Sequence, residues 1–196
     1  MIQEKELNYR KSIKFELIRA KIAFDEYYSL VSVLTGRKFT DVTIMERVRL
    51  YDTYARWCGH LYESLLALVK IEELNDVNES SKSPATDTEI QWEAKKSINR
   101  FNSSVEAGRI NADGIISPSL EDDFSKSLRI VRNRCSFHCT HNRVHEDYLK
   151  SFHERHHHMA YWIFREFSGL HADIESIDDA DLGEINNFCE FLNVEH

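Results

Sequence analysis

Proline and glycine are scarce in this sequence, with two prolines and six glycines in 196 residues. Because these residues punctuate turns, their scarcity favours long helices over many short strands joined by turns. No apolar run reaches the length that a bilayer span needs. Residues 1–6 lack the apolar stretch of a secretory signal. The sequence therefore predicts a cytoplasmic protein that has no membrane partner.

Cysteine is also infrequent, and several well-known motifs are missing. The four cysteines are Cys58, Cys135, Cys139 and Cys189. In a cytosolic protein they are expected to be thiols rather than a disulfide framework. There is no glycine-rich phosphate loop, no nucleophile elbow and no paired-carboxylate motif. Kinases, serine hydrolases and Rossmann enzymes are therefore poorly supported, and the sequence predicts no cofactor.

Positive charge is in deficit overall but is concentrated in one window. The formal net charge is −8, which argues against a surface coated with nucleic-acid contacts. Residues 126–155 nevertheless hold seven Lys or Arg side chains and three acids, so this window is +4 and the remainder is −12. A local basic region in an acidic chain is suited to one focused anionic group, such as a phosphate. The alternative is that these cations simply gather at helix ends.

Apolar residues recur at helical spacing through most of the chain. The predicted helices cover residues 3–35, 43–74, 88–106, a segment that begins near Ser119, residues 143–168, and a short stretch at 184–192. We find no repeat and no strand pattern. The predicted fold is an all-α, up-and-down bundle of four or five principal helices. We expect a bundle domain over residues 1–170, with a polar loop at 75–88, followed by an acidic tail over 171–196.

Local signals place the ends and faces of these helices. Ser119 with Asp122 resembles a capping box at the start of the fourth helix, and Gly36 and Gly169 are natural stops. His60 and Glu63 fall within the apolar pattern of the second helix and are interpreted as boundary residues of its packed face. The apolar stripe of the first helix is Ile13, Leu17, Ala20, Phe24, Tyr27, Val31 and Leu34. It leaves surface available for an isologous dimer.

The segment 131–141 combines basic, polar and aromatic residues between two predicted helices. Arg132 is followed by Asn133 and, after five intervening residues, by His138. Arginine offers a planar fork of donors suited to phosphate oxygens, and histidine moves protons near neutral pH. Together they suffice for metal-free RNA cleavage, in which the ribose 2′-hydroxyl attacks the adjacent phosphorus. Because one histidine cannot easily act on both sides of the phosphorus, two copies facing each other would supply the pair.

Arg132-Asn133 with His138 resembles the signature of the HEPN superfamily (higher eukaryotes and prokaryotes nucleotide-binding domain). The resemblance implies a small helical bundle with the motif near the end of a late helix. Many members are dimeric, metal-independent endoribonucleases of toxin–antitoxin, abortive-infection or CRISPR-associated systems. Carried onto this chain, Arg132 would polarise the scissile phosphate, His138 would be general base or acid, and Asn133 would orient one of them. RNA or a nucleotide, a second copy and an antitoxin are the implied partners.

A second register satisfies the same spacing. Arg134 precedes His141 by six intervening residues, although Cys135 rather than a polar residue follows the arginine. Arg129, Arg134 and His141 are therefore predicted to contact the substrate around the principal pair. Many family members carry an aromatic residue two positions after the histidine, where this chain has Thr140. The subfamily is left open by that departure.

Other uses of these residues remain open. Cys135, Cys139, His141 and His145 have the four-residue steps that place potential zinc ligands on one helical face, but the usual two-residue gap between paired cysteines is absent. No metal site is therefore predicted. The group His153, His156, His157 and His158 is best interpreted as part of a packed helix. The main alternative for the whole chain is a non-catalytic HEPN-like module that binds a nucleotide, RNA or a protein partner.

Overall fold

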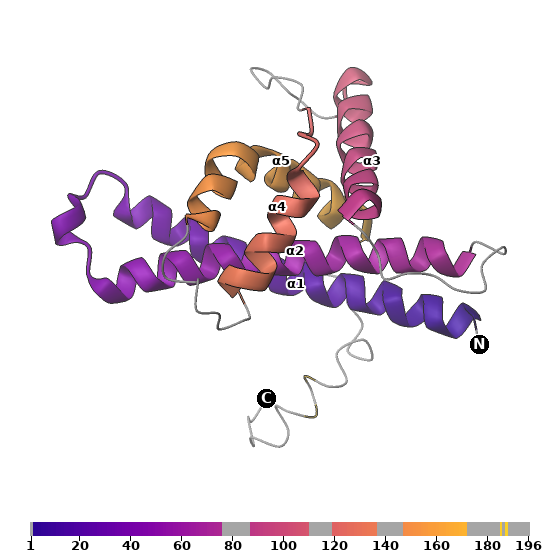
Figure 1. Ribbon diagram of the computed structural model, residues 1–196, viewed down its shortest axis with the longest axis horizontal. Coiled ribbons are helices and arrows are strands. Elements are labelled where there is room, and N and C mark those ends of the chain that lie inside the picture. Colours follow the sequence, from indigo (N-terminus) through magenta and orange to yellow (C-terminus); the bar gives the residue numbers. More distant parts are fainter. Residues whose placement is uncertain are drawn as a thin grey trace.

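Every regular element in the described part of the chain is a helix. The computed structural model describes residues 2–75, 87–109, 119–136 and 147–171, and the single positions 185 and 187. The elements are α1 (Ile2–Leu34), the 3₁₀ turn η1 (Phe39–Asp41), α2 (Ile44–Asn75), α3 (Asp87–Glu106), α4 (Phe124–Val131), the π-helical turn η2 (Arg132–Ser136) and α5 (Tyr148–His171). The predicted all-α helical bundle is confirmed (Figure 1). None of these helices combines the length and apolar character that crossing a bilayer requires.

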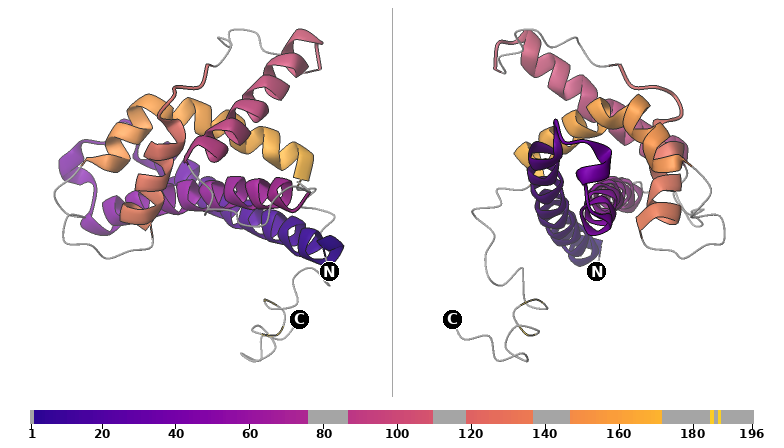
Figure 2. Two further views of the ribbon diagram at one scale, coloured as in Figure 1. Left: turned by 45° about the vertical axis from the view of Figure 1, so that its right-hand side comes forward. Right: turned by 90° about the vertical axis from the view of Figure 1, so that its left-hand side faces the viewer.

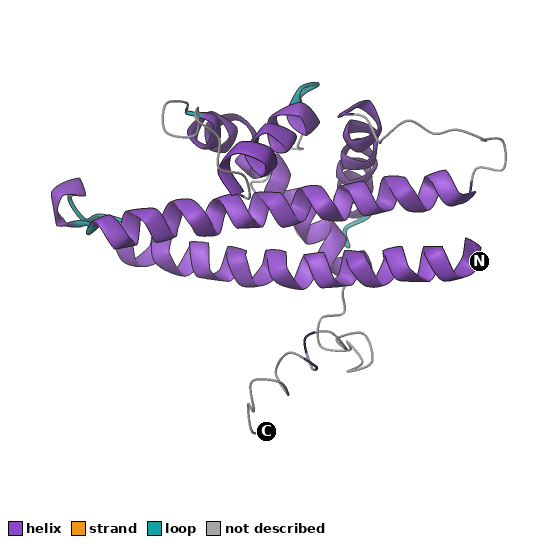
Figure 3. Cartoon of the chain, turned by 60° about the horizontal axis from the view of Figure 1, so that its bottom comes forward, coloured by secondary structure: helices purple, strands orange, loops and turns teal. Residues whose placement is uncertain are grey.

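The two longest helices, α1 and α2, lie side by side and run in opposite directions (Figure 3). The first part of the predicted α1 stripe is buried, with Ile13 and Leu17 almost fully covered. Phe24 continues this contact, and its ring centroid is 5.1 Å from that of Trp57 on α2. The stripe is therefore used inside the chain. Its buried members pack against the matching apolar face of α2, whereas Val31 and Leu34 at its far end are half-buried.

The connection between α1 and α2 is fixed by local polar contacts. Gly36 has a φ of 84°, which is the left-handed region that glycine enters without strain. A capping box then starts α2, in which the backbone N–H of Thr43 donates to Glu46 at 2.8 Å and the backbone N–H of Glu46 donates to the Thr43 hydroxyl at 3.2 Å. Arg37 also donates to Glu46 at 2.9 Å. These contacts satisfy orphan donors at the helix start.

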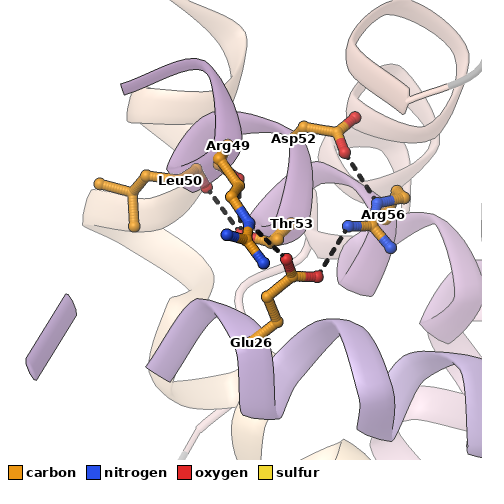
Figure 4. A network of polar contacts seen from close by, with 6 residues as sticks. All are labelled: Glu26, Arg49, Leu50, Asp52, Thr53 and Arg56. Atoms are coloured by element: carbon orange, nitrogen blue, oxygen red, sulfur yellow. Dashed lines mark hydrogen bonds and ion pairs between the residues drawn. The ribbon is translucent and has the colours of Figure 1, made fainter. Parts of the chain in front are cut away.

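A network of charged side chains ties α1 to the first half of α2 (Figure 4). The Glu26 carboxylate accepts hydrogen bonds from Arg49 at 2.7 Å and from Arg56 at 3.1 Å. Arg56 also donates to Asp52 at 2.8 Å. Chiefly because Arg49 donates to it, the pKa of Glu26 is lowered. Such partly exposed pairs contribute little stability, but they fix how one helix lies along the other.

The central helix of the fold is α2, which packs against each of the other four α-helices and against η2. Its core positions include Trp57, Leu61 and Leu65, all fully buried. In contrast to the antiparallel pair, α3 and α4 cross α2 steeply (Figures 1 and 2). Near-perpendicular crossings are a rarer class of ridges-into-grooves packing between helices. The arrangement brings α3, α4 and η2 together beside the middle of α2.

Two predicted boundaries in the second half are wrong. The fourth helix begins at Phe124, not near Ser119, and Asp123 at its N-cap makes no side-chain capping bond. The side-chain oxygen of Gln91 on α3 instead accepts a hydrogen bond from the backbone N–H of Ser125 at 2.9 Å, so a tertiary contact takes the place of the local cap. Gly169 does not end α5, which continues to His171. The polar loop between α2 and α3, residues 143–146, and the tail helix (except positions 185 and 187) lie outside the described residues.

Candidate functional site

The predicted site residues fall into two groups. Arg129 lies in the last turn of α4, and Arg132, Asn133 and Arg134 lie in η2. His138 and His141 lie outside the described residues. The structure therefore shows how the arginine half of the motif is held.

Burial of one helical face dictates how Arg132 is presented. Leu128, Val131 and Cys135 are buried in succession along α4 and η2, and they anchor this segment to the core. Immediately after Val131 the helix widens into the π-helical turn Arg132–Ser136. Such turns add one residue to a helical turn and occur frequently at functional sites. Arg132 is the first residue of this turn and follows the buried Val131 directly. Its side chain is 30% exposed.

The Arg132 guanidinium is held on two edges. Its Nε donates a hydrogen bond to Glu63 Oε1 at 2.7 Å, and Nη2 lies 2.7 Å from the same oxygen. Its Nη1 donates to the side-chain oxygen of Asn133 at 2.9 Å. The guanidinium carbon also lies 5.9 Å from the centre of the Tyr62 ring. Charge-assisted bonds of this length fix the plane of the guanidinium.

A second ion pair lies beside the first. Arg129 forms a two-pronged bridge to Asp87 at the start of α3, with Nε and Nη2 at 2.7 and 2.9 Å from the carboxylate oxygens. Tyr62 lies close to both pairs. Burial raises the pKa of its phenol, and the nearby carboxylates of Asp87 and Glu63 raise it further. We call Tyr62, Glu63, Asp87, Arg129, Arg132 and Asn133 the Arg132 cluster.

The acids of the Arg132 cluster were missed as functional residues by the sequence analysis. The basic window 126–155 suggests an unopposed positive region, but Glu63 and Asp87 neutralise two of its arginines. Its spacing alone predicts that Glu63 is a boundary residue of the packed face of α2. The signal that could have found it is an acid within the apolar spacing of a core helix. Charge counted along the chain cannot reveal a partner 69 positions away.

Arg134 is placed differently from its neighbours. Its guanidinium carbon lies 5.2 Å from the centre of the Tyr148 ring at the start of α5, within the range of a cation–π contact. The buried thiol of Cys135 faces the core, which separates it from Arg134. The remaining residues of the zinc alternative lie outside the described part of the chain.

The histidine group on α5 is divided between the core and the surface. His153 Nε2 lies 3.0 Å from the Tyr27 hydroxyl, and His157 Nδ1 lies 3.2 Å from the Tyr54 hydroxyl. The two imidazole rings stack at 4.6 Å. Burial lowers the pKa of both and brings that of His157 to about 4, so His157 is neutral near pH 7. This agrees with the interpretation of a packed helix.

Comparisons with known proteins add no relative. No protein-family model matches the chain, and neither the curated proteins nor the solved structures contain a match.

Two larger pockets flank the bundle. One, of about 750 Å³, is lined by the end of α2 and the starts of α3 and α4, and Asp87 of the Arg132 cluster contributes to its wall. The other, of about 590 Å³, is lined by α1, η1, α2 and α5 and is largely apolar. The described lining of these two pockets does not include Arg132. The Arg132 and Glu63 side chains are 30% and 28% exposed, so this part of the cluster is partly open to solvent.

Proposed function

We propose that this protein is a metal-independent endoribonuclease of the HEPN type that acts as a homodimer. The observation that supports this most directly is the guanidinium of Arg132. It is held in a fixed plane by Glu63 and Asn133, remains partly exposed, and lies on the π-helical turn that leads toward His138. An arginine oriented in this way is suited to the oxygens of one phosphodiester.

The chemistry follows from the two side chains. His138 would remove the proton from a ribose 2′-hydroxyl, whose oxygen then attacks the adjacent phosphorus. The bond from phosphorus to the 5′-oxygen breaks, and an imidazolium, from the second copy, protonates the leaving oxygen. The products are a 2′,3′-cyclic phosphate and a 5′-hydroxyl. Arg132 would stabilise the charge that develops on the phosphoryl oxygens.

The other members of the Arg132 cluster would have supporting roles. Glu63 and Asn133 would hold the guanidinium so that its remaining N–H groups point toward the phosphate. Arg129 is engaged by both oxygens of Asp87, so within the cluster it serves to anchor α4 on α3. Arg134, stacked on Tyr148, would contact a more distant phosphate. A role in a toxin–antitoxin or phage-defence system is consistent with such an activity.

The test is cleavage of a labelled, structured RNA by purified protein in EDTA. We expect cleavage with 2′,3′-cyclic phosphate ends, and a loss of at least about 100-fold in rate for Arg132→Ala and for His138→Ala. Arg10→Ala is the matched control, because Arg10 is an exposed α1 residue paired with Glu6, and it should cleave normally. If the two site variants cleave like the parent, the proposal is wrong.

A second candidate function has its own support. Glu63 already neutralises Arg132, as expected of a module that retains the fold and binds without turnover. That function is a non-catalytic nucleotide, RNA or protein-binding domain. The same proteins distinguish the two: RNA binding that is lost in Arg132→Ala, with no product over long incubation, would favour the binding module.

A further inference from the structure

His156 on α5 is a buried imidazole that makes no hydrogen bond within the described part of the chain. Its exposed fraction is 1%, and its ring lies between Phe124 and Phe152, at centroid distances of 5.7 and 5.3 Å. Neither ring nitrogen makes a hydrogen bond there. Buried polar side-chain atoms are bonded in the large majority of cases, so this imidazole has a donor and an acceptor that the apolar core does not use.

Two carboxylates converge on this imidazole from the turn before α4. The nearest is Asp123, whose Oδ1 lies 3.7 Å from His156 Nε2, which is too long for a hydrogen bond. Glu121 completes the group. One ligand atom from each of the three residues lies within 4.8 Å of the other two.

The position between the two carboxylates already attracts a cation. The guanidinium of Arg155 lies 2.5 Å from Glu121 and 2.9 Å from Asp123. The Arg155 side chain is 50% exposed, so it can turn into solvent without leaving a cavity in the core. A small pocket of about 70 Å³ has Arg155 and His156 in its lining, although neither carboxylate lines it.

We propose that Glu121, Asp123 and His156 form a binding site for a divalent transition-metal ion of the zinc class, with Arg155 displaced from the carboxylates. One imidazole nitrogen and two carboxylate oxygens are a donor set that Zn²⁺ accepts, with water as a fourth ligand. The imidazole disfavours Mg²⁺ and Ca²⁺, which prefer all-oxygen sites. The two carboxylates would also balance the charge of the ion.

The geometry requires only a modest contraction. Bonds of about 2.0–2.1 Å in a tetrahedron place neighbouring ligand atoms about 3.3 Å apart. His156 and Asp123 are already within a few tenths of an ångström of this separation. Glu121 has a half-exposed side chain, so its carboxylate can move the remaining distance toward the other two ligand atoms. A bound ion would tie the start of α4, and with it the segment that leads to Arg132, to α5.

The experiment uses the full chain without a histidine tag. Binding of Zn²⁺ is measured by competition with a chelating fluorescent indicator, and Co²⁺ is used in parallel, because its visible absorption reports tetrahedral coordination. We expect one high-affinity site per chain. Asp123→Asn and Glu121→Gln should each weaken it at least about tenfold, and His156→Ala should abolish it. Arg155→Ala should tighten it, because the competing guanidinium is gone.

Matched controls distinguish this site from nonspecific Zn²⁺ binding by other side chains. Asp122→Asn removes the adjacent, highly exposed carboxylate, and His158→Ala removes an exposed imidazole of the same helix. Both should bind Zn²⁺ like the parent. The proposal is overturned if Asp123→Asn binds as the parent does, or if Asp122→Asn and His158→Ala lose as much. Arg132→Ala should leave metal binding unchanged, so this test and the nuclease test fail independently. Should His156→Ala not fold, Asp123→Asn and Glu121→Gln decide the matter.

Discussion

At the scale of single residues, the molecule pairs each described arginine of its basic window with an acid or an aromatic ring from another part of the fold. Arg132 meets Glu63, Arg129 meets Asp87, and Arg134 lies over Tyr148. The window that looks strongly positive along the chain is therefore much less so in space. Its value for binding an anion depends on which N–H groups the partners leave exposed, not on its net charge.

Glu63→Gln tests whether the acid positions Arg132. Because both side chains are close to 30% exposed, we expect a loss of less than about 1 kcal/mol in the free energy of unfolding. RNA cleavage should fall roughly tenfold or more, because a misplaced guanidinium loses much of its effect. Unfolding in urea and single-turnover cleavage provide the two measurements.

The matched control for this variant is Glu26→Gln. Glu26 is also a helical carboxylate bound by arginines, Arg49 and Arg56, but it belongs to the α1–α2 network. It should lower stability by a similar small amount and leave cleavage unchanged. Equal cleavage by both variants would show that Glu63 has no positioning role.

At the scale of elements, each helix end is decided by whichever contact satisfies its polar groups most strongly. The start of α2 uses a local capping box, Thr43 with Glu46. The start of α4 has a comparable local candidate in Ser119 with Asp122, yet the helix begins only at Phe124. The side chain of Gln91 on α3 accepts from the backbone N–H of Ser125 and donates to the carbonyl of Glu121, which satisfies backbone groups at this helix start. A tertiary contact therefore sets this helix start.

The capping box of α2 predicts a dependence of stability on pH. Hydrogen bonds from Thr43, and then from Arg37, lower the pKa of Glu46 from 4.5 to about 2. A carboxylate whose pKa is lowered by folding stabilises the protein above its unfolded pKa, and this contribution is lost as the pH falls through the folded pKa. Glu46→Gln should therefore melt below the parent at pH 7. The difference should shrink between about pH 4.5 and pH 2.

The measurement is the melting temperature of both proteins across that range, together with the carboxyl carbon shift of Glu46 by NMR. A difference that stays constant down to about pH 2 would contradict the assigned role of the charge. A Glu46 midpoint near 4.5 would do the same.

Replacing glycine by alanine is predicted to change the stability of the protein in opposite directions at Gly169 and Gly36. Gly169 is helical, and a Cβ there would meet nothing within 4 Å. Gly169→Ala should therefore stabilise the protein by up to about 0.5–1 kcal/mol, because the unfolded chain loses freedom. Gly36 has a φ of +84°, so Gly36→Ala is the matched control and should destabilise by about 1 kcal/mol. Urea unfolding measures both, and equal signs would refute the helical placement of Gly169.

At the scale of the whole molecule, α2 organises the fold, because it packs against each of the other α-helices and against η2. Glu63 and Tyr62 project from its middle toward α4 and η2. The Arg132 cluster is therefore built on the most central helix of the chain. Sites supported by rigid elements hold their geometry better than sites on loops.

The proposed nuclease requires two copies, which gives a prediction about assembly. Sedimentation should give a mass twice that of the 23.1 kDa chain at micromolar concentration. Cleavage per chain should fall when the protein is diluted below the dissociation constant of the dimer, because each copy alone lacks the second histidine. A monomer with undiminished cleavage on dilution would exclude a site shared between copies.

The sequence by itself determined the helical class and the positions of the first three α-helices. The ranges 3–35, 43–74 and 88–106 differ from the observed helices by one residue at most at each end. The agreement is close because helical periodicity and turn residues act over a few positions along the chain. The same reasoning identified Arg132 and Asn133 as candidates, and their function stays a prediction until the variants are measured.

Only the tertiary structure decided the partners of the charged residues. Glu63 reaches Arg132 across 69 positions, Asp87 reaches Arg129 across 42, and Asp123 reaches Arg155 across 32. Nor does spacing reveal that His156 is buried beside two carboxylates. Charges carry no periodic signal, and a pair forms only after apolar packing has brought two helices together. Packing therefore selects the electrostatic contacts, which explains why the candidate sites could not be completed from the sequence.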